Sequence, residues 1–389
     1  MRVAIYSGAI PNTTFIDLLV RGVADKGIDI YLFGIKQKPV QYANKHVHVY
    51  STPTGKLGLV LSVTWRFIAL LLRHPERIKI INHIVKTRYS NSVIRAWGKY
   101  LPIMLYLPDI FHLQWAKGAE DWLFLKQLGV KMVVSFRGTQ INIDPKTSSN
   151  LSEIYKRSLP LYDGYHCVSE AIKKEGVNYG ALAEKAMVIY PAVEEKLLSS
   201  QLKRTSSDVL RILSVGREHW VKGYPVALDA MTILKQMGVA FHYTIVAGGD
   251  KEELIYAISD LGLANEVTLI DNLPHEKVLE QYANADLFLL PSHEEGIANV
   301  VLEAMALGTL VISTNCGGMS EVVVDGVNGL IVSIRNPKAI ADAVIRFTQM
   351  EESQKQMMVE NAKETIKKKH VLSIQVSQMV KLYERVCHE

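Results

Sequence analysis

The sequence has little cysteine, and it lacks the tracts that mark secreted, fibrous or disordered chains. Its three cysteines, Cys167, Cys316 and Cys387, are scattered over 389 residues. An odd, scattered set predicts neither a disulfide framework nor a cysteine metal cluster, and it favours a reducing compartment such as the cytoplasm. The opening segment 1–6 is too short an apolar run for a signal peptide, so we expect it to be a strand.

Long apolar runs are also missing. The longest, Leu57–Leu72, has sixteen residues with Arg66 inside it, which is too short and too interrupted to span a bilayer. We expect this run to form a buried helix of the first domain. The alternative is a helix at a bilayer surface, where Trp65, Phe67 and the leucines enter the lipid and Arg73–Lys79 supplies basic side chains to the headgroups.

Acidic residues are scarce in the first half of the chain. Residues 1–190 hold 25 Lys and Arg against 13 Asp and Glu, a net charge of +12, whereas the remainder holds 19 against 26, or −7. Residues 56–100 contain nine basic side chains and one acid, Glu76. Such a face is either merely solvated or attracted to an anionic membrane or acceptor. It carries no recognised nucleic-acid-binding motif, so we expect no nucleic-acid partner.

Segments of strand and helix character alternate along the chain, which predicts an α/β protein with parallel sheets. In the first half, strands over 2–6 and 28–33 flank a helix over 13–26, and the intervening loop is not the G-x-G-x-x-G of dinucleotide-binding proteins. In the second half, strands are expected over 209–215, 243–247, 267–270, 286–290 and 309–313, and helices over 225–236, 338–349, 352–366 and 371–386. Residues 188–191 and the polar stretch 199–208 mark the crossover between the halves.

The stretch 291–321 contains the most informative pattern. An apolar strand ends at Pro291, a polar turn with Glu295 and Gly296 follows, and a helical pattern runs to Gly308. A second strand then leads into Gly317-Gly318. Strand, turn, helix and strand in this order place a helix N-terminus at the carboxyl edge of a parallel sheet, where N–H groups suit a phosphate.

A second polar cluster follows the strand at 209–215. Arg217 and Lys222 lie between Gly216 and Gly223, so both side chains can reach the same cleft beyond the strand end. These cations and the helix N-terminus could bind a phosphate group without a metal ion. No Asp-x-Asp triplet occurs in the chain, and we therefore predict no metal cofactor.

In order, the motifs Pro-Ser, Glu-Gly, Glu-Ala-Met-Ala, Gly, Gly-Gly and Glu over 291–321 resemble the donor-binding segment of family 4 glycosyltransferases. The resemblance implies the GT-B fold, in which two doubly wound Rossmann-like domains face each other across a cleft. It further implies an acceptor-binding domain over 1–190, a nucleotide-sugar domain over 191–370, and a C-terminal helix over 371–389 that crosses back onto the first domain.

The resemblance also implies roles for individual residues. Arg217 and Lys222 would clamp the diphosphate, Glu295 would hold hydroxyls of the donor sugar, and Glu303 would hold the ribose. The remaining predicted donor-binding residues are Gly216, Gly249, Leu273, Gly296, Ile297, Ala298 and Asn299.

The first half offers fewer signals. A lone histidine is more often structural than catalytic, but His112 follows a strand as the active-site histidine of the family does, and we favour a catalytic role. Gly8, Thr13 and Arg137 are the predicted acceptor-binding residues, and Arg137 stands where many relatives carry histidine. Ser169 lacks a G-x-S-x-G elbow, so it is predicted to be a helix N-cap.

The predicted function is transfer of a sugar, with retention of configuration, from a nucleoside diphosphate such as UDP to a hydroxyl of a lipid-linked or surface-polysaccharide glycan. The expected location is the cytoplasm, with peripheral contact at an anionic membrane. Two alternatives stay open: a GT-B enzyme with a soluble acceptor, such as a disaccharide synthase or a sugar epimerase, and a nucleotide-sugar-binding module without turnover.

Overall fold

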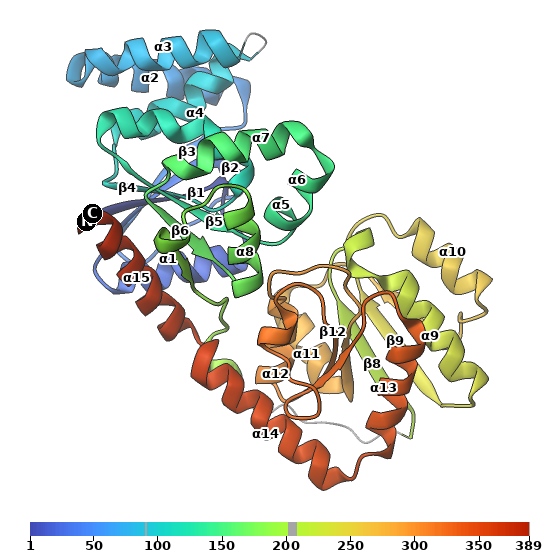
Figure 1. Cartoon of the computed structure of the whole chain (residues 1–389). Helices are drawn as coiled ribbons and strands as arrows, with labels where there is room; N and C mark the ends of the chain where they lie inside the picture. The colour runs from blue at the N-terminus through green and yellow to red at the C-terminus, as the bar shows by residue number, and fades with distance from the viewer. Residues whose placement is uncertain (90–91, 201–207, 389) are drawn as a thin grey trace. The chain divides into compact units, whose positions relative to one another are not determined.

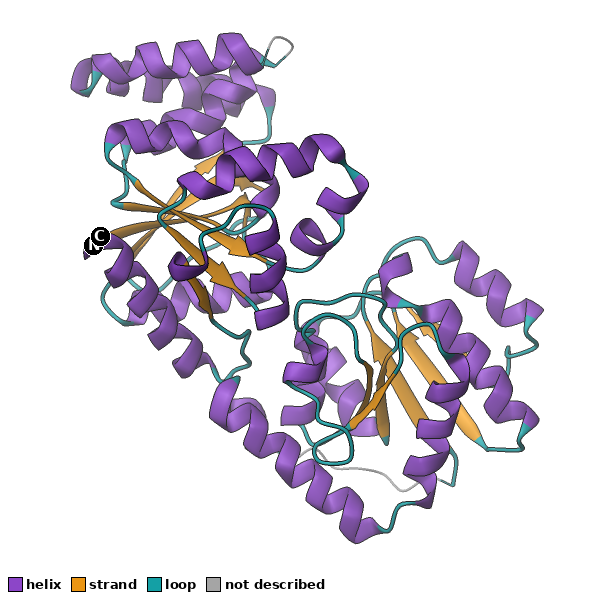
Figure 2. Ribbon diagram, viewed as in Figure 1, coloured by secondary structure: helices purple, strands orange, loops and turns teal. Residues whose placement is uncertain are grey.

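The computed structural model describes residues 1–89, 92–200 and 208–388. The chain divides into two compact units. Unit 1 comprises Met1–Cys167, Glu175–Ile189 and the chain from Val376 onward, and unit 2 comprises Val168–Lys174 and Tyr190–Gln375. Each unit contains a parallel sheet flanked by helices (Figures 1 and 2). Most of the polar stretch predicted as the crossover, 201–207, lies outside the described residues.

The sheet of unit 1 has seven parallel strands in the order β3-β2-β1-β4-β5-β6-β7. The order reverses between β1 and β4, which makes the sheet doubly wound. The strands are β1 (Arg2–Ile10), β2 (Asp29–Lys36), β3 (Val47–Thr52), β4 (Ile110–Leu113), β5 (Lys131–Phe136), β6 (Gly164–Cys167) and β7 (Ala186–Val188). The helices are α1 (Thr14–Asp25), α2 (Lys56–Arg73), α3 (Pro75–Arg88), α4 (Val93–Leu105), η1 (Ala116–Leu128), α5 (Thr139–Asn142), α6 (Asp144–Thr147), α7 (Ser149–Ser158), η2 (Leu159–Leu161), η3 (Ala183–Lys185), and parts of α8 (Glu170–Asn178) and α15 (Leu372–His388).

The sheet of unit 2 has six parallel strands in the order β10-β9-β8-β11-β12-β13, reversing between β8 and β11. The strands are β8 (Leu210–Val215), β9 (Phe241–Val246), β10 (Val267–Ile270), β11 (Leu287–Leu290), β12 (Leu310–Thr314) and β13 (Leu330–Val332). The helices are η4 (Glu195–Leu197), η5 (Trp220–Lys222), α9 (Tyr224–Gln236), α10 (Glu252–Asp260), α11 (His275–Asn284), α12 (Asn299–Ala306), η6 (Met319–Glu321), α13 (Pro337–Gln349) and α14 (Glu352–Lys369).

The central strands of unit 2 are apolar throughout because helices cover both faces of the sheet. In β11, Leu287 and Leu289 join the hydrophobic cluster on one face. Phe288 and Leu290 join the cluster on the other. The alternation follows from the two-residue period of a strand, and it explains why this run reads as continuously hydrophobic.

The C-terminal helix α15 packs on unit 1 from Val376 onward. A side chain at Gly164, the first residue of β6, would place its Cβ 2.7 Å from Val386 Cγ2. The absence of a side chain therefore lets the helix approach the strand closely. The predicted two-sheet α/β fold with a C-terminal helix returning to the first unit is confirmed.

Two details of the organisation differ from the sequence expectations. The predicted boundary between residues 190 and 191 puts Val168–Lys174 in the first domain, whereas this segment belongs to unit 2. The expectation that 57–72 forms a buried helix is wrong, because only Leu59 and Leu70 of α2 are buried. Figure 1 shows α2 and α3 as the outermost helices of unit 1, with α4 between them and the sheet.

Candidate active site

Two loops at the carboxyl edge of unit 2 are pressed together, one after β8 and one after β11. Gly223 ends η5 with a φ of +66°, and a Cβ there would lie 2.1 Å from the carbonyl oxygen of Pro291. In the same place the N–H of His293 donates to the carbonyl of Val221 at 2.7 Å. Only glycine allows this approach, so Gly223 sets the distance between the segments that carry Lys222 and Glu295.

Lys222 and Glu295 form an ion pair between these loops. Lys222 Nζ lies 2.7 Å from Glu295 Oε1, and the side chains are 21% and 16% exposed. The hydroxyl of Ser292 donates to the same carboxylate oxygen at 3.0 Å. The predicted site residues are thus brought together, but as partners of each other, so a ligand that takes Lys222 must release Glu295.

Arg217 lies at the exposed surface of the first loop. Among the residues that the structure describes, its guanidinium has no hydrogen-bond or ion-pair partner. The loop after β8 thus carries two cations, Arg217 and Lys222. Lys222 must leave Glu295 before it can bind an anion, whereas Arg217 has no such partner to leave.

Gly317 and Gly318 pack directly on the loop that contains Glu295. A Cβ on Gly317, whose φ is +50°, would lie 1.8 Å from the carbonyl oxygen of Glu295. A Cβ on Gly318 would lie 2.1 Å from the carbonyl oxygen of Gly296. Both glycines are therefore required for the conformation of the Glu295-Gly296 turn, which explains why the pair occurs in the motif.

Helix α12 begins after this turn without a side-chain cap. Its N-cap is Ala298, which has no side-chain acceptor, and Ile297 and Ala298 are both buried. The first-turn N–H groups of a helix lack intrahelical partners and carry a partial positive charge. The side-chain oxygen of Asn299 is buried without a partner among the described residues. The helix start therefore directs N–H groups of partial positive charge toward this edge of the sheet, without a side-chain cap to satisfy them.

Glu303, in the same helix, is held by two neighbours from α11. His275 Nε2 lies 2.8 Å from Glu303 Oε1, and the Tyr282 hydroxyl donates to Oε2 at 3.2 Å. The hydrogen bond to Glu303 raises the pKa of His275. Sequence reasoning missed His275 and Tyr282, because neither carries a motif and only the fold brings α11 beside α12.

The remaining predicted donor-binding residues lie on neighbouring loops of unit 2. Gly216 follows β8, and a Cβ there would lie 3.1 Å from Lys222 Cε. Gly249 follows β9 with a φ of +121°. Leu273 is partly buried and packs on the hydrophobic cluster that contains α12. A Cβ on Gly248 would lie 2.0 Å from Asn272 Oδ1, so that glycine allows the loop after β10 to approach.

His112, the predicted catalytic histidine, is built into the interior of unit 1. It is fully buried, with Nδ1 2.7 Å from the hydroxyl of Tyr383 and Nε2 2.8 Å from that of Ser135. Ser135 continues the chain to His166 Nδ1 at 2.8 Å. Burial lowers the pKa of His112 to about 3. Both ring nitrogens join β4 to α15 and β5, an arrangement that favours a structural role over the predicted place beside the reacting carbon.

The predicted acceptor residues lie in or after the strands of unit 1. Gly8 has a φ of +89° at a bulge in the pairing of β1 with β2. Thr13 is the N-cap of α1 through its backbone, since Ile16 N–H donates to its carbonyl at 3.0 Å. Arg137 follows β5, and its Nη2 donates to Gln114 Oε1 at 3.1 Å.

Ser169 caps helix α8, as predicted, because its hydroxyl oxygen accepts the N–H of Ile172 at 3.1 Å. Glu321, the last residue of the 291–321 motif, accepts the N–H groups of Glu170 at 2.9 Å and Ala171 at 3.0 Å. Its carboxylate thus satisfies the start of the same helix. Sequence reasoning recorded Glu321 as part of the motif without a role.

Two absences hold for residues 1–89, 92–200 and 208–388. No helix there is both long and apolar enough to cross a membrane. No cluster of three or more His, Cys, Asp or Glu residues there is arranged to hold a metal ion.

Comparisons with known proteins agree with this geometry. A family model described as "Glycosyl transferases group 1" matches residues 199–365. The amylovoran biosynthesis glycosyltransferase AmsK of Erwinia amylovora is 30% identical over 374 residues, 88% of this chain and 89% of that protein. The putative colanic acid biosynthesis glycosyltransferase WcaL of Escherichia coli (strain K12) is 28% identical over 268 residues, 66% of each chain.

Solved structures match the whole chain. Sucrose-phosphate synthase from Thermosynechococcus elongatus aligns over 99% of both chains with a TM-score of 0.76 and 19% identity. HepE from Anabaena, in complex with UDP and glucose, aligns over 99% of both chains with a TM-score of 0.69 and 18% identity. These likenesses show the GT-B fold. With the relationship to AmsK, they establish that this chain is a glycosyltransferase and belongs to the group 1 family, also called family 4.

Proposed function

We propose that the enzyme transfers a sugar, with retention of configuration, from a nucleoside diphosphate sugar, with UDP as the nucleotide, to a hydroxyl of a lipid-linked or surface-polysaccharide glycan. The observation that carries the donor half is the group of cations and N–H dipoles at the carboxyl edge of unit 2. Arg217 is unpaired, Lys222 can exchange Glu295 for a ligand, and the start of α12 is uncapped. These groups suit a diphosphate whose negative charge grows as it leaves.

In this reaction the bond from the sugar's anomeric carbon to the diphosphate oxygen breaks, and a bond to the acceptor oxygen forms on the same face. The proton of the acceptor hydroxyl passes to the departing phosphate, so no protein base is required. When Lys222 turns to the diphosphate, Glu295 is freed to accept hydrogen bonds from the sugar hydroxyls. Glu303, oriented by His275 and Tyr282, accepts hydrogen bonds from the ribose.

The donor half is tested by thermal shift with UDP, GDP and ADP, because a ligand that binds only the folded state raises Tm in proportion to its occupancy. UDP is expected to give the largest rise. Lys222→Ala should reduce donor affinity or hydrolysis at least about tenfold. Lys338→Ala removes an exposed lysine that pairs with Asp342 on α13 and should change neither. Equal responses of the two variants would refute the donor site.

Metal independence stays a prediction, and it is checked separately. Turnover should be the same with excess EDTA and with added Mg²⁺ or Mn²⁺, since Arg217, Lys222 and the start of α12 supply the positive charge. A loss of activity in EDTA that Mg²⁺ restores would contradict the prediction.

The outward face of α2 supports an acceptor at a membrane. Seven large apolar side chains of this helix are between 44% and 79% exposed. They lie at helical spacing on one side of α2: Leu57, Val60, Leu61, Trp65, Ile68, Leu71 and Leu72. A contiguous exposed apolar stripe of this kind marks an interaction surface. Phe67 does not belong to it, because its ring packs edge-on against Trp97.

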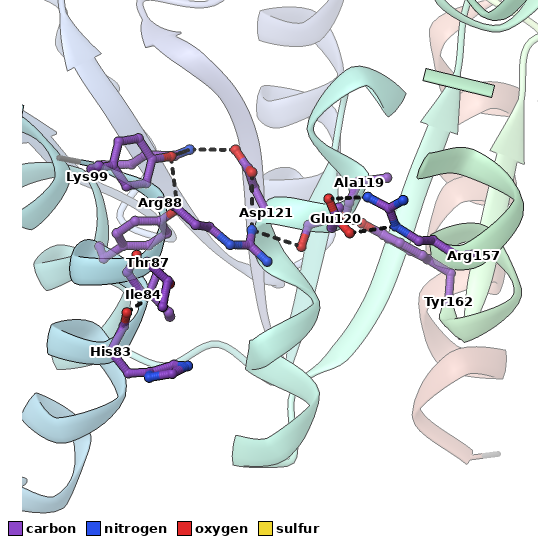
Figure 3. Close-up of polar contacts among 12 residues, drawn as sticks. His83, Ile84, Thr87, Arg88, Lys99, Ala119, Glu120, Asp121, Arg157 and Tyr162 are labelled. Atoms are coloured by element: carbon purple, nitrogen blue, oxygen red, sulfur yellow. Dashed lines mark hydrogen bonds and ion pairs between the residues drawn. The ribbon is translucent and has the colours of Figure 1, made fainter. Parts of the chain in front are cut away.

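Charge favours an anionic bilayer as the surface that covers this stripe. Arg88 and Lys99 share one carboxylate, that of Asp121, which cancels one of their two charges, while Arg157 pairs with Glu120 (Figure 3). Five other exposed basic residues of α2, α3 and α4 have no ion-pair partner among the described residues: Lys56, Arg73, Lys79, Lys86 and Arg95. Each basic residue near an anionic membrane contributes about 1 kcal/mol to binding.

A cavity of about 430 Å³ in unit 1 has residues of α2 and α4 in its lining. Apolar side chains of Ile35, Pro53 and Leu59 line it, together with the polar groups of Tyr6 and Lys99. A largely apolar pocket of this size with a few polar groups suits part of an amphiphilic acceptor. The names of AmsK and WcaL place those relatives in polysaccharide biosynthesis, which agrees with such an acceptor and with a location at the cytoplasmic face of a membrane.

Co-sedimentation with vesicles tests the acceptor half. Vesicles of phosphatidylglycerol should retain the enzyme and release it at high salt, because exposed charges are screened. The triple substitution Leu61→Ser, Trp65→Ser and Ile68→Ser should lower binding about 100-fold or more, since each buried side chain is worth about 1.5–3 kcal/mol. Ile255→Ser with Tyr256→Ser, which are equally exposed on α10, is the control. If the triple variant binds as tightly as the control, the acceptor is soluble.

A further inference from the structure

A guanidinium without an acidic partner lies at the carboxyl edge of the unit 1 sheet. Arg137 follows β5, and its Cζ lies 4.9 Å from the centre of the Phe15 ring. Its Nη2 donates a hydrogen bond to Gln114 Oε1 at 3.1 Å. Its Nε is buried and has no partner among the described residues. Burial lowers the pKa of Arg137 to about 10, so the side chain stays charged at neutral pH.

Two side-chain amide nitrogens beside the same edge also have no hydrogen-bond partner among the described residues. Gln114 follows β4 and is fully buried, and its Nε2 has no partner among the described residues. Because Arg137 donates to Oε1 of this amide, the unpaired atom of Gln114 is its donor. Asn12, in the loop after β1, accepts the hydroxyl of Ser7 at Oδ1 and leaves Nδ2 buried and unpaired.

The three groups come from adjacent strands, since β1, β4 and β5 lie next to one another in the sheet. Phe15, whose ring lies under Arg137, is the second residue of α1, three residues after Asn12 in the chain. All three unpaired atoms are hydrogen-bond donors. The nearby carboxylates are used elsewhere, because Asp17 pairs with Arg21.

Unpaired buried donors are costly to a protein unless a ligand satisfies them. A buried cation is costly for the same reason and is usually paired. A structural arginine would have a carboxylate here, and an apolar ligand would leave all three donors unsatisfied. The chemistry that completes the set is an anion with several acceptor oxygens, a phosphate or a carboxylate.

We propose that Arg137, Gln114 and Asn12 bind an anionic group of the acceptor. The inference rests on the proposed function, because it takes the acceptor to be bound by unit 1 and the donor by unit 2. A lipid-linked glycan presents a phosphate, and an acidic surface glycan presents a carboxylate. Both have the oxygens that the three donors require, and the planar fork of Arg137 fits either of them.

The test uses the full chain with Arg137→Met, which keeps the length of the side chain and removes its charge. The probes are inorganic phosphate and glucuronate, and the measurement is the rise in Tm. All measurements are made in the Lys222→Ala background, so that phosphate binding at unit 2 contributes less. Arg157→Met, which removes an arginine paired with Glu120 at the surface, is the matched control.

Arg137→Met is expected to abolish the stabilisation by phosphate or glucuronate and to leave the ligand-free Tm unchanged or a few degrees higher, since it removes an unpaired buried charge. The probe that stabilises the parent protein identifies the anion as phosphate or carboxylate. A fall in ligand-free Tm with the probe response retained would show a structural arginine and overturn the proposal.

UDP binding separates this proposal from the donor assignment. With Lys222 intact, Arg137→Met should bind UDP as the unchanged enzyme does. If the variant loses phosphate and UDP responses together, the anion at Arg137 belongs to the donor and the proposal fails. If the unchanged enzyme shows no response to any nucleotide, the proposed function fails, whereas the phosphate response of Arg137 still decides the anion site.

Discussion

A double-mutant cycle can measure separately what the Lys222–Glu295 pair contributes to stability and to activity. The two charges are 2.7 Å apart, and at an effective dielectric constant of about 20 their attraction is about 6 kcal/mol before desolvation is subtracted. Because both side chains are mostly buried, removal of one partner leaves the other inadequately compensated. We expect Lys222→Met and Glu295→Gln each to lower the free energy of unfolding by about 1–3 kcal/mol.

The double variant Lys222→Met with Glu295→Gln should recover most of that stability, because it leaves no unpaired charge. The coupling free energy, which is the sum of the two single losses minus the loss of the double variant, is then about 2–5 kcal/mol, at or above the upper end of the range of about 0.5–3 kcal/mol typical of groups in contact. Urea denaturation of the four proteins gives the stabilities, and hydrolysis of a UDP-sugar without acceptor gives the activity. The double variant should remain at least about tenfold less active than the unchanged enzyme.

The double variant should therefore recover stability without recovering activity. Stability depends on the two charges being matched, whereas binding of a diphosphate depends on the ammonium group alone. Stability losses that simply add would show that the pair does not exist in solution. A double variant with normal hydrolysis would show that Lys222 does not contact the donor.

Three further predictions concern single residues. Glu303 raises the pKa of His275 above its unfolded value. The stability from this pair is therefore fully present below about pH 6.5 and is lost as pH rises through the raised pKa. In urea denaturation, His275→Ala should destabilise the protein more at pH 5.5 than at pH 9, and an equal effect at both pH values would contradict the pair. Gly223→Ala should lower the free energy of unfolding by about 2 kcal/mol or more, the order of magnitude of a strained backbone, and should abolish donor hydrolysis. The control is Gly238→Ala. Gly238 has a φ of +73° and open space where a Cβ would lie, so this substitution should cost only about 1 kcal/mol. For His112 the folded pKa of about 3 lies below the unfolded value, so its contribution to stability is lost as pH falls below about 6.5; His112→Gln should flatten this acid dependence while donor hydrolysis stays within about threefold, and a loss of a hundredfold at unchanged stability would restore the catalytic role.

The strands and helices of unit 2 could be predicted because local patterns and packing agree there. The apolar run 286–290 is buried on both faces as β11, and the glycines at 308, 317 and 318 lie where backbone geometry requires them. Lys222 and Glu295 are 73 residues apart in the chain. Their meeting could be anticipated only because strand order places both loops at one sheet edge.

His112 could not be assigned correctly from the chain alone. A residue after a short strand can face the substrate or the helix packed on the sheet, and the two-residue period of a strand decides which. The partner that settles the matter is Tyr383, 271 residues away in α15. Sequence patterns carry no information about such a contact, and the same reasoning explains why His275 was missed.

Helix α2 shows a different limit of sequence reasoning. Its apolar residues recur at helical spacing, and this period reveals a stripe without revealing which way the stripe faces. The structure shows that Leu59 and Leu70 suffice to pack α2 on unit 1, so the apolar residues on the opposite side remain exposed. Water alone does not stabilise such a face. Under the proposed function, the five exposed basic residues of α2, α3 and α4 that have no ion-pair partner among the described residues favour an anionic bilayer over a second apolar protein, because mobile anionic headgroups adjust to their positions.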